Sequence, residues 1–289
     1  MTTTLEPGGQ GAAQLPPVGP AGIVGDTDAF LTGTWGVRPR SYRCRTLPDA
    51  PSPAQIWEQF DCGLFVTPYF TVLRDDTPVP LGAVTETRVV QQQPRVGYAD
   101  GAAVRAHFAT GHTVRLNQPE DWHPGIGELV AAVREDLRAA VRSALFLTPA
   151  GTVGAPARSR RDHVIVVQLR GRTVWETGDA AEREVFALEA GDALYVPAGV
   201  TRAGSVRGDE SLHLALSVSR PGPREFAVAA VTGFLESAVA DAVAGTHHYM
   251  SPAEKVAWLR TELTAYLSGQ DTGELVSRAV RAHQGAEKA

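Results

Sequence analysis

Three short apolar runs in the second half of the chain constrain its fold more than any other feature. They are VIVVQL at 164–169, ALYVPAG at 193–199 and SLHLALSV at 211–218, joined by turns that contain glycine, such as the one at 170–172. Runs of this length and β-branched content, bounded by glycine turns, are typical of buried strands. We therefore predict that they form the central strands of a β-sandwich or barrel.

Helical patterns flank this β region. A polar cap at Asp26 precedes several apolar residues, which predicts a short helix ending near Pro39. Apolar residues over 124–147 fall on one face at helical spacing and predict an amphipathic helix. The chain after residue 223 has the same spacing twice, and a capping box at 251–254 begins the second helix.

The other segments suggest the domain boundaries. Residues 1–25 are rich in Gly, Pro and Ala and have too few large apolar side chains to offset the entropy of ordering, so we predict a disordered tail. Residues 41–120 alternate β-like runs with Pro, Gly and Asp turns and are predicted to be predominantly β. We expect one β-rich domain over 26–220 and a helical segment over 221–289.

Composition limits the classes of partner. The 289 residues, 43% hydrophobic and 20% charged, indicate a folded globular protein. A net charge of −5 gives no general attraction to nucleic acid or to anionic membranes, and no apolar run is long enough to cross a bilayer. Cys44 and Cys62 have no CxxC spacing, and the chain does not start with a secretory pattern. We therefore expect a reduced, cytoplasmic protein that binds neither membrane nor nucleic acid.

Five blocks follow one another after residue 110: GHTVRLNQPEDWHPGIGELVAAVREDL, TPAGTVG, HVIVVQLRGRTVW, LEAGDALYVPAGVTRAG and ESLHLAL. In content and order they resemble the cupin-4/JmjC ribosomal oxygenases, which are iron(II)- and 2-oxoglutarate-dependent protein hydroxylases. The resemblance covers residues 27–240 and is most specific over 148–217. It implies a mainly β fold with helices: a double-stranded β-helix, the cupin or JmjC jelly roll, with N-terminal helix elements and a C-terminal helical segment.

The resemblance also implies where the metal ligands should lie. The family holds iron with a facial triad of two histidines and a carboxylate, written His-x-Asp before the first of the three strands, with a distal His after LYVPxG. Counted from these anchors, the three ligand positions fall on Arg158, Arg160 and Arg202. Arginine stays protonated and has no free lone pair, so it cannot replace imidazole or carboxylate at a metal. We predict a degenerate triad without iron.

The position of the cosubstrate anchor differs as well. The resemblance places the family's Lys or Arg for 2-oxoglutarate at Thr173. Arg172 is adjacent, but a shift of one residue on a strand turns a side chain to the opposite face. We therefore predict no cofactor and interpret the chain as a pseudo-oxygenase. Because crowded arginines need an anion among them, we predict an anion pocket for an anionic small molecule or an acidic peptide.

Three alternatives stay open. The run at 158–161 can be a solvated basic loop. An Arg-lined pocket can also catalyse without metal by stabilising developing negative charge. A local bulge can bring Asp162 or His163 to a ligand position, with His213 on the following strand, and so retain an iron and 2-oxoglutarate oxygenase with unusual ligands. The structural interpretation of His213 is a hydrogen-bonded core histidine.

The helices over 223–268 have a separate interpretation. Both have wide stripes of Ala, Leu and Val. Such stripes need a surface to cover them, either the domain's own sheet or a second copy of the chain. A homodimer through this segment is therefore one expected partner arrangement.

Overall fold

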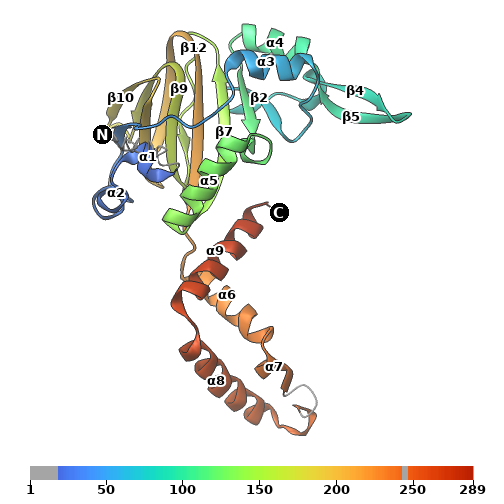
Figure 1. The fold of residues 1–289 in the computed structure, drawn as a ribbon, viewed down its shortest axis with the longest axis vertical. Helices are drawn as coiled ribbons and strands as arrows, with labels where there is room; N and C mark the ends of the chain where they lie inside the picture. The colour runs from blue at the N-terminus through green and yellow to red at the C-terminus, as the bar shows by residue number, and fades with distance from the viewer. Residues whose placement is uncertain (1–18, 243–246, 289) are drawn as a thin grey trace, which may run out of the picture.

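The computed structural model describes residues 19–242 and 247–288, and its body is an antiparallel sheet of ten strands. The strands run in the order β1-β11-β9-β12-β7-β6-β2-β3, with β10 paired to β9 and β8 paired to β12. Their bounds are β1 Arg40–Arg43, β2 Phe70–Arg74, β3 Thr77–Pro78, β6 Thr113–Asn117, β7 Ala140–Thr148, β8 Ala157–Arg158, β9 His163–Thr177, β10 Glu184–Glu189, β11 Asp192–Val196 and β12 Thr201–Ser219. In Figure 1, β9 and β12 run side by side through the curved sheet. The predicted mainly β jelly roll is confirmed.

Alternation along β9 separates two apolar layers. Ile165 and Val167 pack into the large core beneath the helices, whereas Val164 and Val166 pack into a smaller cluster with Trp175. Successive side chains of a strand point to opposite faces, so this strand is buried on both. The smaller cluster borders the cavity described below.

Two short helices begin the described chain, α1 (Pro20–Val24) and α2 (Thr27–Gly33). Asp26 caps α2 by accepting a hydrogen bond from the backbone N–H of Ala29 at 2.9 Å, which confirms a helix after Asp26, although it ends at Gly33 and not near Pro39. Ile23 and Val24 of α1 are buried, so the prediction of a disordered tail reaching residue 25 is wrong. Residues 1–18 of that predicted tail lie outside the described residues.

The helix predicted over 124–147 is α5 (Pro124–Leu137), which ends ten residues earlier than expected. Arg138 adopts a left-handed conformation with φ 48° and terminates it, and β7 begins at Ala140. Val141 and Leu145 are four residues apart. That spacing suits one face of a helix, but an even spacing also keeps both on one face of a strand.

Residues 41–120 contain two helices, α3 (Pro53–Asp61) and α4 (Gly101–Ala109), in addition to the predicted strands. Ser52 and Gln55 form a capping box at the start of α3, a signal that the β pattern of this stretch obscured. Strands β4 (Thr85–Val90) and β5 (Gln93–Ala99) form a separate hairpin that extends away from the body in Figure 1.

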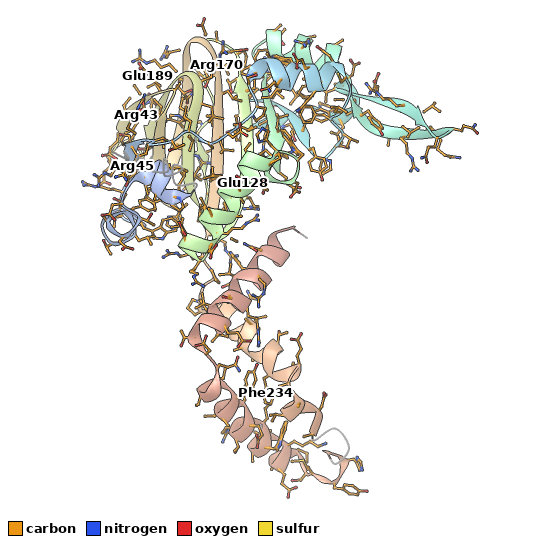
Figure 2. The ribbon with its side chains drawn as sticks, in the orientation of Figure 1. Arg43, Arg45, Glu128, Arg170, Glu189 and Phe234 are labelled. Atoms are coloured by element: carbon orange, nitrogen blue, oxygen red, sulfur yellow. The ribbon has the colours of Figure 1, made fainter. Side chains whose placement is uncertain are left out.

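The C-terminal helices form an arm that projects from the sheet (Figure 1). They are α6 Pro223–Leu235, α7 Ala238–Ala242, η3 His247–Tyr249, α8 Pro252–Gly269 and α9 Thr272–Lys288. Phe234 lies inside the arm (Figure 2), with its ring 6.1 Å from Trp258 and 5.6 Å from Tyr266. The returning helix α9 contacts the body where His283 Nε2 and Ser219 Oγ are 2.9 Å apart. The predicted capping box of Ser251 and Glu254 is confirmed.

Gly171→Ala is expected to lower the free energy of unfolding by about 2 kcal/mol more than Gly151→Ala. Both glycines have similar left-handed backbones, with φ +71° and +75°. A Cβ at 171 would lie 2.3 Å from the backbone oxygen of Glu210, whereas a Cβ at 151 meets nothing within 4 Å. Urea unfolding of both variants measures the difference, and equal costs would contradict the steric explanation.

Candidate functional site

A cavity of about 120 Å³ opens beside the smaller apolar cluster, between β6, β7, β9 and β12. Its polar lining consists of Asp76, Thr113, Thr148, Thr152, Thr173, Arg202 and His213. Its other lining residues are Phe146, Gly154, Ala155, Ala157, Val166, Trp175, Gly204, Val206 and Ala215. One arginine therefore lies in a largely apolar enclosure.

Arg202 is the cation that lines this cavity. It lies near the start of β12, opposite Ala157 of β8 in the register of the two strands. Burial lowers the pKa of its guanidinium, while the charges of Asp76 and Asp162 raise it. No hydrogen bond or ion pair within 4.0 Å joins the side chain of Arg202 to any residue that the structure describes. Its donors are therefore available to a ligand.

His213 and Trp175 supply two more ring nitrogens. His213 is 8% exposed, stacks on Phe146 with ring centroids 4.9 Å apart, and meets the edge of Trp175 at 5.3 Å. Burial, and then the charge of Arg202, lowers the pKa of His213 to about 3, so the imidazole is neutral at pH 7. Neither His213 Nδ1 nor Trp175 Nε1 has a hydrogen-bond partner among the described residues. His213 is therefore buried, as expected of a core histidine, but the expected hydrogen bond is absent at its Nδ1.

Thr173 stands where the resemblance places the cosubstrate anchor. It is 2% exposed, and its Oγ1 lies 2.8 Å from Ser211 Oγ, which also accepts a hydrogen bond from Gln168 Nε2 at 2.8 Å. The anchor position is thus a neutral hydroxyl in a short chain of buried hydrogen bonds. Arg172 is exposed and lies 3.9 Å from Glu189, on the face expected from a shift of one residue.

The other two arginines of the predicted pocket do not line this cavity. Arg158 and Arg160 are both exposed, whereas Ala157, directly before Arg158, faces the cavity opposite Arg202. The predicted convergence of three arginines is therefore corrected to Arg202 alone. The physical reason is strand alternation: a count that is off by one residue exchanges inward and outward side chains.

The count back from Gln168, which placed the ligand positions at Arg158 and Arg160, is wrong because of the turn that leads from β8 into β9. The backbone N–H of Asp162 donates to Ser159 Oγ at 3.0 Å, and the N–H of Gly199 donates to Ser159 O at 2.7 Å. This compact turn interrupts the alternation between Ala157 and the anchor at Gln168. A count back from Gln168 therefore does not preserve the inward face.

Of the three residues that could have retained an iron site, His213 lines the cavity, whereas Asp162 and His163 do not. Asp162 forms an ion pair with Arg142 at 3.1 Å. His163 Nδ1 lies 2.7 Å from the Tyr195 hydroxyl, and its ring stacks on Trp35 at 4.0 Å. Because Ile165 and Val167 continue the face of His163 into the large core, that histidine points away from the cavity that His213 lines.

The cavity does not fit iron held by a facial triad. Asp76 and His213 are the lining residues of metal-ligating type, one fewer than the triad needs, and Arg202 places a positive charge beside them. Across the described parts of the chain, no group of three or more His, Cys, Asp or Glu side chains could hold a metal ion.

Sequence reasoning missed three features of the site. Trp175 belongs to the smaller apolar cluster and also lines the cavity, and Ala157 carries no chemical signal. Asp76 lies in the turn between β2 and β3 with φ 61°, where an aspartate is readily explained by turn chemistry alone. Side-chain direction, which only the fold supplies, identifies all three.

Comparison with known proteins agrees with the fold. No family model matches the chain. The bifunctional lysine-specific demethylase and histidyl-hydroxylase NO66 of Branchiostoma floridae is 28% identical over 166 residues, which is 55% of this chain and 27% of that protein. The NO66 of Drosophila grimshawi is 30% identical over 144 residues, 42% of this chain and 20% of that protein. The chain thus matches less than a third of the length of either relative.

A solved structure also matches the fold of this chain. The ribosomal oxygenase YcfD from Escherichia coli, in complex with cobalt and 2-oxoglutarate, superposes with a TM-score of 0.56 at 18% identity, covering 88% of this chain and 72% of that one. The fold is that of the cupin and JmjC jelly rolls. Within this class, the chain is similar in sequence to the NO66 hydroxylases and similar in fold to the ribosomal oxygenase YcfD.

Proposed function

We propose that this protein is a metal-independent pseudo-oxygenase that binds a carboxylate-bearing ligand in the jelly-roll cavity. One observation carries the proposal: Arg202, Trp175 and His213 face the same cavity, and the Arg202 guanidinium, Trp175 Nε1 and His213 Nδ1 have no partner among the described residues. Buried polar groups are costly to leave unpaired. A carboxylate is acceptor-only and matches the fork of an arginine.

The size of the cavity narrows the ligand. Pockets for drug-sized molecules span roughly 300–1,000 Å³, whereas this one holds about 120 Å³. A small carboxylic acid fits that space and a nucleotide does not. Of the two anionic ligands expected from the sequence, the cavity volume favours the small molecule. The acidic side chain of a peptide would bring the same carboxylate group.

The Arg202→Met variant is expected to lose the binding of small carboxylates. Propionate, butyrate and succinate at a hundred times their dissociation constants should each stabilise the native protein by about 2.7 kcal/mol. Removing the guanidinium removes the charge that holds them. Arg172→Met, which changes an exposed arginine on the other face, is the matched control. Thermal unfolding with and without each acid measures the effect, and an unchanged response in Arg202→Met would contradict the proposal.

Similarity to known proteins favours a second candidate function, an iron and 2-oxoglutarate oxygenase with unusual metal ligands. NO66 is named as a hydroxylase, and the YcfD complex holds cobalt and 2-oxoglutarate. Metal analysis of protein purified without chelator, together with a succinate assay, separates the two. Stoichiometric iron with succinate formation would overturn our proposal. A metal-independent enzyme is the third reading of the site, in which Arg202 stabilises developing negative charge.

We also propose a homodimer through the C-terminal arm. Leu235 of α6 is 62% exposed and Val256 of α8 is 55% exposed, and α8 has no buried residue along its 18 positions. A second copy of the arm would cover these side chains. Light scattering is expected to give twice the chain mass, and Leu235→Glu with Val256→Glu to give the mass of one chain. Monomeric wild-type protein would contradict the dimer.

The cytoplasm is the proposed compartment. Cys44 and Cys62 are both free thiols, as expected in a reducing environment. Among the helices of the described residues, none combines the length and the apolar character that crossing a bilayer requires.

A further inference from the structure

Asp76 introduces a negative charge at the same cavity. It lies in the turn between β2 and β3, next to Asp75, and both residues have positive φ, 61° and 49°. Asp76 is exposed at the rim, and it lines the cavity together with Arg202. The lining of the cavity therefore contains one carboxylate and one guanidinium.

Asp76 and Arg202 influence each other's pKa although they form no ion pair within 4.0 Å. Partial burial raises the pKa of the Asp76 carboxyl, while Arg202 and Arg115 act in the opposite direction. No ion pair within 4.0 Å joins Asp76 to Arg202, and neither side chain has a hydrogen bond to another described residue. The other carboxylate whose charge raises the pKa of Arg202 is Asp162, which is paired with Arg142. Both side chains are therefore available to groups of one ligand in the cavity.

A simple carboxylate satisfies only half of this arrangement. It would accept hydrogen bonds from Arg202, but it would lie in a small enclosure together with the like charge of Asp76. A ligand that also has an ammonium group would pair with both, because an ammonium donates and a carboxylate accepts. Charge-assisted hydrogen bonds of this kind are stronger than neutral ones.

We propose that the ligand is a small amino acid, held by its carboxylate on Arg202 and by its ammonium on Asp76. This inference rests on the proposed carboxylate function of the same cavity. Phe146, Val166 and Ala215 give the same cavity an apolar lining, and the volume of about 120 Å³ admits a short aliphatic body. The favoured class is therefore an aliphatic amino acid of the size of alanine, γ-aminobutyrate or valine.

Matched pairs that differ only in the amine test this proposal. Isothermal titration of the full-length protein would compare L-alanine with propionate, γ-aminobutyrate with butyrate, and L-valine with 3-methylbutanoate. At least one amino acid is expected to bind about tenfold or more tightly than its deaminated partner, since a hydrogen bond between two charged groups is stronger than a neutral one.

The Asp76→Asn variant is expected to abolish that preference while leaving carboxylate binding intact or stronger. Asparagine tolerates the left-handed backbone of this position, so the turn should be retained. Asp75→Asn makes the same change at the neighbouring residue and is expected to keep the preference. Circular dichroism and the unfolding temperature of each variant verify the fold.

The possible outcomes separate this inference from the function on which it rests. If the amino acids bind equally or more weakly while carboxylates still bind through Arg202, the proposal of an amino-acid ligand is wrong and that of a carboxylate pocket is retained. A preference for amino acids that survives Asp76→Asn would also overturn it. If neither member of any pair binds, the carboxylate pocket itself is wrong.

Discussion

Lowering the pH from 7 to 4 is expected to remove about 3 kcal/mol of the free energy of unfolding through His213 alone. The His213→Asn variant is expected to lack this part of the pH dependence. Typical domains are stable by only about 5–15 kcal/mol, so the effect is a large share of the total.

The sign follows from the two pKa values of His213. Its pKa is about 3 in the folded protein, against an ordinary value of 6.5. Between these values the unfolded chain binds a proton that the folded protein does not, so stability falls as the pH falls. The contribution is fully present above about pH 6.5 and is lost progressively as the pH approaches 3. Arg202 and Asp76 are the charged groups that line the same cavity, and Arg202 opposes protonation.

Urea unfolding of the wild type and of His213→Asn at pH 7, 6, 5 and 4 measures this contribution as the difference between the two curves. The buffers must contain no carboxylate, because a bound anion beside His213 would favour its protonation. His163 also has a lowered pKa through burial and contributes in the same direction. His163 is intact in both proteins and cancels in the comparison. Parallel curves for wild type and variant would contradict the prediction.

Sequence patterns predicted the architecture because burial enforces them. The run at 164–169 is apolar on both faces since one face packs under the helices and the other borders the cavity. The C-terminal boundary of α5 was predicted wrongly because the spacing of Val141 and Leu145 suits one face of a helix and one face of a strand equally. What ends the helix is the left-handed backbone of Arg138, and arginine is not a typical residue for that conformation.

The site was less predictable than the fold, because its identity depends on single-residue register. Arg202 follows GDALYVPAG at a short distance, and the structure places it at the cavity. Arg158 and Arg160 were counted through the turn at Ser159, where strand alternation does not hold. The inward position is held by Ala157, which no chemical pattern could identify.

Replacing Ala157 and Arg202, which both face the cavity, by histidine is expected to create a metal site. Ala157 and Arg202 are direct partners across β8 and β12 and both line the cavity, as does His213. Side chains opposite each other on paired strands have Cβ atoms about 4.5–5.5 Å apart, within reach of one ion. Ala157→His with Arg202→His would therefore present three imidazoles to one cavity and remove its positive charge. Imidazole suits cobalt, zinc and iron.

The double variant is expected to bind Co²⁺ with a micromolar dissociation constant, about 4 kcal/mol stronger than millimolar binding, whereas the wild type binds none. Visible absorption of the bound cobalt and isothermal titration measure it. Arg158→His with Arg202→His is the matched control, because Arg158 is exposed and points away from the cavity. His213→Asn in the background of the double variant should weaken the site by removing the third imidazole. If the Arg158 variant bound cobalt as tightly as the Ala157 variant, the counted register would be right and Arg158 would face inward.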